Sequence, residues 1–128
     1  MEKKIALFYY KKNESQNKII FNITNYFKYR IKLFGNIVIV KNINDSDMGI
    51  YIDSNKINND IDILIKNINN IDIITQKFKK NNITYDTINN MKYFDNIKHS
   101  SIYLNINENI NDEKLFDISQ IIIEFFNN

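Results

Sequence analysis

The residue best equipped for chemistry in this 128-residue chain is its single histidine. His99 stands beside Ser100 and Ser101, so the three residues combine the types found in a histidine-activated serine nucleophile. No acidic residue adjoins them, and closeness in sequence does not by itself build a catalytic triad. We interpret His99 as a residue at the entry to a strand. We expect no catalysis by the protein's own side chains.

Metal binding is not indicated either. Asp45, Asp47 and Asp53 form a loose acidic series, but the calcium-loop spacing and its closing glutamate are absent, which favours a solvated turn. The chain has no cysteine, and this excludes disulfides and thiolate metal sites. Its net charge is +2 with the lysines spread along the chain, so no nucleic-acid footprint is predicted.

The first residues and the lack of a long apolar run predict a cytoplasmic protein, and the composition indicates an AT-rich genome. The start Met-Glu-Lys-Lys precedes only six apolar residues, too few for a signal-peptide core. No apolar run approaches the roughly 18 residues of a membrane span, so no membrane partner is expected. The 28 isoleucines and 24 asparagines reflect AT-rich codons, and we therefore give isoleucine little weight as a sign of β-structure.

The elements that would position a site begin with an apolar run at residues 5–10, which is typical of a strand buried on both faces. A polar loop at residues 11–17 follows, with Ser15 as the expected N-cap of a helix. Gly35 is the expected left-handed stop of that helix. Its apolar stripe has helical spacing and consists of Ile19, Ile20, Ile23, Phe27, Ile31 and Phe34.

Further elements follow in alternation. Strands are predicted at residues 36–41 and 61–65, separated by a polar segment, residues 42–59, read as a loop with a turn of helix. A helix with the stripe Ile68, Ile71, Ile74 and Phe78 follows and closes at Asn81 and Asn82. Residues 83–98 fit either a short strand (83–88) or a short helix (91–97). Residues 101–106 alternate as an edge strand does. Asn111 caps a last helix.

This alternation predicts one α/β domain over residues 1–128. We expect three layers: a doubly wound, mostly parallel sheet of four or five strands with helices on both faces.

The first half resembles the flavodoxin-like family, whose members bind FMN at the carboxyl ends of their strands. Residues 4–10 with the following loop match the family's opening strand and phosphate loop, and residues 35–44 and 59–65 match its second and third strands. Glu14 stands where the family has glycine. The resemblance implies an FMN or other phosphate ligand, used for electron transfer. The residues that would hold it are Lys11, Lys12, Asn13, Ser15, Gln16 and Asn17.

Two alternatives remain open. In the first alternative, the domain is a cofactor-free interaction module that binds a protein partner or a second copy through the edge strand at residues 101–106. In the second alternative, residues 117–126 resemble the closing strand of glyoxalase-type domains. Glu124 of this chain would then take the position of the metal-binding glutamate of that family.

Overall fold

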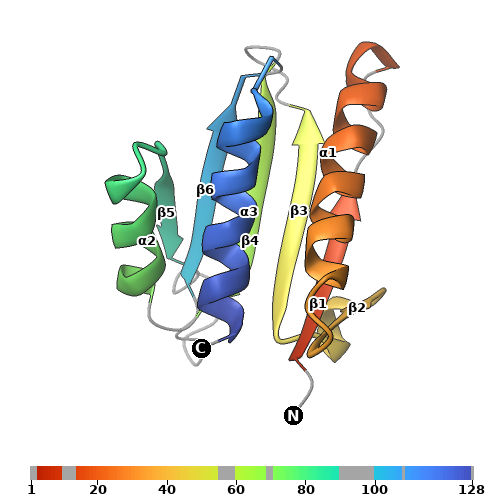
Figure 1. Cartoon of the computed structure of the whole chain (residues 1–128), viewed down its shortest axis with the longest axis vertical. Helices are drawn as coiled ribbons and strands as arrows, with labels where there is room; N and C mark the ends of the chain where they lie inside the picture. Colours follow the sequence, from red (N-terminus) through yellow and green to blue (C-terminus); the bar gives the residue numbers. More distant parts are fainter. Residues whose placement is uncertain are drawn as a thin grey trace.

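The computed structural model describes residues 3–9, 14–54, 60–68, 71–89, 100–107 and 109–127. Figure 1 shows these ranges as one sheet with helices packed against it. The elements, in chain order, are β1 (Lys3–Tyr9), α1 (Glu14–Lys32), β2 (Ile37–Val40), the 3₁₀ turn η1 (Ile43–Asp45), β3 (Met48–Ser54), β4 (Ile61–Ile68), α2 (Ile71–Lys80), β5 (Asp86–Asn89), β6 (Ser100–Ile106) and α3 (Asp112–Asn127). The α/β class expected from the sequence is confirmed.

The six strands form a single sheet in the order β2-β1-β3-β4-β6-β5. β1 lies between β2 and β3 and is parallel to both, as its apolar run predicts. Its pairing with β2 covers only Lys3 to Ala6, whereas its pairing with β3 runs from Ile5 to Tyr9. The carboxyl-terminal half of β1 therefore extends beyond the end of β2.

The sheet departs from the expected one in strand number and direction. It is mixed, because β4 pairs antiparallel with β3 and β6, and β5 pairs antiparallel with β6. Only residues 55–60 separate β3 from β4, and a parallel crossover needs about a dozen residues or more. β3 itself lies in the segment expected to be a loop. Its Met-Gly-Ile-Tyr-Ile-Asp-Ser sequence holds four apolar residues, but Gly49 interrupts them and polar residues flank them on both sides, so they do not stand out as a strand.

The helices pack on one face of the sheet, not on both. α3 contacts both α1 and α2, and α1 and α3 lie in front of the strands in Figure 1. β4 shows the consequence most clearly: Ile61, Ile63 and Ile65 are fully buried, whereas the alternate residues are half-buried. Within the described ranges no helix covers the second face. We call it the helix-free face.

The two ends of α1 differ from those expected. α1 begins at Glu14, which places Ser15 inside the first turn and not at the cap. No glycine in the described residues has a positive φ, so Gly35 is not a left-handed stop. α1 ends instead in a tightened turn, in which the N–H of Phe34 donates to the Ile31 carbonyl at 3.1 Å. The left-handed residue is Asn82, with φ of 59°, just after α2.

The remaining expectations for the second half have mixed outcomes. β6 lies between β4 and β5, so the expected edge strand is interior and the sheet edges are β2 and β5. Apolar and polar residues alternate along β6 because helices cover one of its faces and not the other. Residues 117–126, a strand in the glyoxalase-type reading, lie within α3. His99 and the alternative helix at residues 91–97 fall outside the described residues, whereas β5 occupies part of the alternative strand.

Candidate functional site: a lysine groove beside β1

The expected phosphate-binding residues divide into two groups. Lys11, Lys12 and Asn13 lie outside the described residues. Ser15, Gln16 and Asn17 lie in the first turn of α1. Asn17 is half-buried, and its side-chain oxygen accepts no hydrogen bond from the described residues. Phosphate binding at residues 11–17 stays a prediction.

A groove lies beside these residues because β2 and α1 differ in length. At about 3.3 Å per residue the four residues of β2 span roughly 13 Å, whereas the 19 residues of α1 span about 28 Å. Beyond the last residue of β2, α1 therefore overhangs a part of β1 that is paired with β3 on one side and has no neighbouring strand on the other. The resulting groove has a volume of about 460 Å³, within the usual range of ligand pockets.

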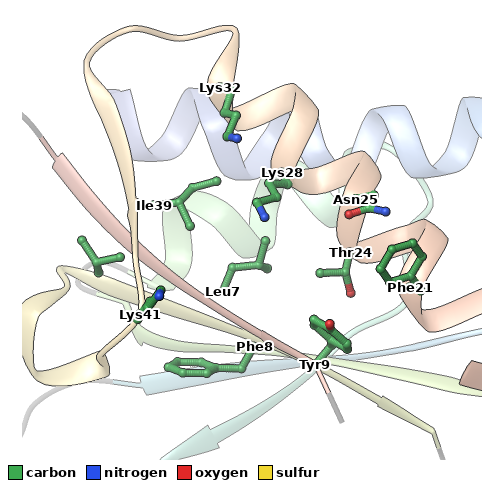
Figure 2. Close-up of a pocket in the computed structure, with 11 residues that line it drawn as sticks. Leu7, Phe8, Tyr9, Phe21, Thr24, Asn25, Lys28, Lys32, Ile39 and Lys41 are labelled. Atoms are coloured by element: carbon green, nitrogen blue, oxygen red, sulfur yellow. The ribbon is translucent and has the colours of Figure 1, made fainter. Parts of the chain in front are cut away.

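Three lysines line this groove, and we call it the lysine groove. Lys28 and Lys32 come from successive turns of α1, and Lys41 directly follows β2. Figure 2 shows Lys28 and Lys32 on the helix wall and Lys41 on the strand wall. All three are exposed, and within the described residues none forms an ion pair. Cations on two walls of a concave surface raise the local positive potential and favour an anion between them.

The other end of the lysine groove is aromatic. The rings of Tyr9 and Phe21 meet edge to face, with centroids 6.4 Å apart and planes at 76°. Both are unusually open for large apolar groups, with 38% of Tyr9 and 46% of Phe21 exposed. Figure 2 shows the two rings together at the end of the groove away from Lys41. Ring faces in this setting can stack against a planar ligand.

Between the two ends lie polar side chains of α1. Asn25 is exposed and offers both a donor and an acceptor to the groove. Thr24 is buried, and its hydroxyl donates to the Ile20 carbonyl at 2.7 Å, so it can only accept a further hydrogen bond. Residues of β1 and β2 complete the lining of the groove: Leu7, Phe8, Ile39 and Val40.

The helix-free face carries a second grouping, a row that crosses the sheet. Strand register places Phe8 opposite Tyr51, Tyr51 opposite Leu64, and Leu64 opposite Tyr103. Phe8 and Tyr51 stack at 4.9 Å with planes 19° apart, and the Lys66 ammonium lies 4.9 Å from the Tyr51 ring centroid. All four members of the row are half-buried. The row makes a continuous, partly apolar surface.

A polar cluster adjoins this row. The Tyr103 hydroxyl donates to Asp62 at 2.5 Å, and the Asn105 amide donates to the same carboxylate oxygen at 2.9 Å. Asp53 lies directly opposite Asp62 in the register. In the part of the chain that the structure describes, no group of three or more histidine or acidic side chains is arranged to hold a metal ion.

Sequence reasoning missed the lysine groove although a signal was present. Phe21, Asn25, Lys28 and Lys32 follow one another at intervals of four, three and four, which aligns them on one stripe of α1. This stripe flanks the apolar one. That it faces a gap in the sheet depends on where β2 stops, which the sequence of α1 does not contain.

Comparison with known proteins adds little. No family model matches the chain, and no curated protein matches it. Among solved structures, a PelC dodecamer from Paraburkholderia phytofirmans aligns over 98% of this chain and 87% of its own, with 5% identity and a TM-score of 0.33. A similarity this weak supports no inference about fold or function. None of the helices in the described ranges has the length and apolar character needed to cross a bilayer.

Proposed function

We propose that this protein binds a phosphate-bearing ligand in the lysine groove. The observation that carries the proposal is that Lys28, Lys32 and Lys41, from two walls, line one cavity. Lysine holds phosphate as a compact point charge with three donors, and several lysines around one cavity add their attraction. The proposal moves the expected ligand site from residues 11–17 along α1, to the side of β1 that β2 leaves uncovered.

The flavodoxin-like ancestry proposed from the sequence is supported by the order β2-β1-β3, which that family shares. It is weakened by the antiparallel β4 and by the helix-free face. FMN is a candidate ligand, since the three lysines suit its phosphate and the Tyr9–Phe21 corner suits a planar ring. A bound flavin would supply electron-transfer chemistry, whereas this chain's residues would hold and orient it.

Titration of the intact protein with FMN and, separately, inorganic pyrophosphate tests the proposal, with melting temperature and calorimetric heat as readouts. Binding to the native state must raise the melting temperature. The informative variant is K28A/K32A, and its matched control is K79A/K80A, which removes two exposed lysines from α2. We expect at least one anion to bind, with affinity lost only in K28A/K32A. If neither anion binds at millimolar concentration, or if the two variants behave alike, the proposal is wrong.

A second candidate function is a cofactor-free interaction module. The row Phe8, Tyr51, Leu64 and Tyr103 on the helix-free face supports it, because sheet faces with aromatic side chains are common protein contacts. A homodimer is the simplest form. Light scattering at increasing concentration tests it: we expect a mass increase that the Leu64→Asp variant abolishes. A monomer at all concentrations would count against this candidate.

A further inference from the structure

The two ends of the lysine groove differ in chemistry, and this difference specifies the ligand more closely than the charge of the groove alone does. Its cationic end and its aromatic end belong to the same stripe of α1. Phe21 and Lys28 are seven residues apart, which is about 10 Å along the helix axis, and Lys32 is one turn further. A ligand that used both ends would be elongated, with a planar ring at one end and negative charge at the other.

The number of lysines suggests more than one phosphate group. Lys28 and Lys32 are about 6 Å apart along the axis, and Lys41 approaches from the opposite wall. Three ammonium groups placed in this way surround a short chain of phosphates more readily than a single phosphate. Each ammonium can then contact different oxygens, and the charges of a diphosphate at neutral pH are nearly balanced.

The middle of the groove fits a sugar. Asn25 lies four residues after Phe21 and three before Lys28, so its carboxamide is exposed between the two ends. A carboxamide both donates and accepts, which matches hydroxyl groups. A simple aromatic acid or an inorganic polyphosphate would leave this part of the groove unused.

We infer that the ligand of the lysine groove is a nucleoside diphosphate or a closely similar nucleotide. In this arrangement the base stacks on the Tyr9–Phe21 corner, the ribose lies beside Asn25, and the phosphates lie among the three lysines. The inference rests on the proposed function and adds the ring and the sugar to it. Because the corner provides ring faces, stacking sets little preference between bases.

The experiment compares pyrophosphate, ADP, UDP and FMN by calorimetry on the unmodified protein and on two variants. Phe21→Leu keeps an apolar side chain and removes the ring, and Leu33→Ala is its control at an exposed apolar position of the segment after α1. We expect ADP and UDP to bind at least about fivefold more tightly than pyrophosphate, as one stacked base provides. Phe21→Leu should remove this advantage and leave pyrophosphate binding unchanged, whereas Leu33→Ala should alter neither.

The possible outcomes separate the two proposals. If pyrophosphate and ADP bind equally well, the nucleotide inference is overturned and the phosphate proposal stands. If FMN binds more tightly than both nucleotides, the site is a flavin site and the inference is again wrong. If the ADP advantage survives in Phe21→Leu, the base does not lie at the aromatic corner. If no anion binds at all, the proposed function fails together with its extension.

Discussion

The ring of Tyr9, at the end of β1, lies edge to face with the ring of Phe21 in α1, 6.4 Å away between centroids. This contact links the uncovered half of β1 to the overhanging part of α1. It also closes one end of the lysine groove, since both rings line it. The groove is therefore framed by secondary structure on its long sides and by an aromatic pair at its end.

Anion binding in the lysine groove should depend strongly on salt. Exposed charges are screened over about 10 Å at 0.1 M ionic strength and over about 3 Å at 1 M. We expect pyrophosphate affinity to fall at least tenfold between 0.05 and 0.5 M potassium chloride, because the lysines are exposed. The Lys41→Met variant should bind more weakly at low salt and show a shallower salt dependence. Calorimetric titrations at four salt concentrations measure both. An affinity independent of salt would contradict an electrostatic site.

The left-handed residue after α2 provides a stability test. Asn82 has φ of 59°, the Ile83 N–H donates to the Phe78 carbonyl at 2.9 Å, and the Asn82 N–H donates to the Lys79 carbonyl at 3.1 Å. This is a Schellman C-cap, in which glycine is unstrained and β-branched residues are strained. We expect Asn82→Gly to be neutral or slightly stabilising and Asn82→Val to cost about 1–2 kcal/mol in unfolding free energy.

Urea denaturation of both variants, followed by circular dichroism, gives the comparison. Gly35→Ala is a useful control, since a β-carbon at Gly35 would meet nothing within 4 Å and its φ is not positive. That substitution should be neutral or stabilise by about 0.4–1 kcal/mol. Equal effects of valine and glycine at position 82 would show that the C-cap does not constrain the end of α2 in solution.

Arg30 of α1 contacts α3, and we expect its replacement to lower the free energy of unfolding. Its guanidinium lies 4.2 Å from the ring centroid of Phe116 in α3, and it donates a hydrogen bond to Gln120 of the same helix. We expect Arg30→Lys to destabilise the fold by about 1 kcal/mol, because lysine keeps the charge but loses the planar stacking and fork. A double-mutant cycle of Arg30→Lys with Phe116→Leu measures the coupling. Strict additivity would mean that the stacked contact contributes nothing.

The local elements of this fold were predictable, because each carries its own pattern. The apolar run of β1 and most of the stripes of α1, α2 and α3 are found where spacing indicates, although Ile68 lies in β4 and Phe34 lies after the end of α1. Asn111 is the clearest case: its side-chain oxygen accepts the N–H of Lys114 at 2.8 Å, which is the expected N-cap bond. Ser15 was misplaced because the residue before Glu14 is an asparagine, which suits an N-cap as well as serine does.

The arrangement of these elements in the sheet could not be predicted from the sequence. β3 combines Gly49, Asp53 and Ser54 with four apolar residues and has polar residues on both sides, so its strand pattern is weak. The antiparallel turn into β4 follows from a connection too short for a crossover, and this could be recognised only once β3 was known. The lysine groove depends on the ending of β2 at Val40, a tertiary fact that no stripe on α1 encodes.

The most direct test of the lysine groove is an amide chemical-shift titration of the isotopically labelled protein with ADP. We predict saturable shifts concentrated at residues 7–9, 21–32 and 39–41, with those near Phe21 absent when pyrophosphate replaces ADP. Shifts confined to the helix-free face, or no shifts at millimolar ADP, would contradict the account.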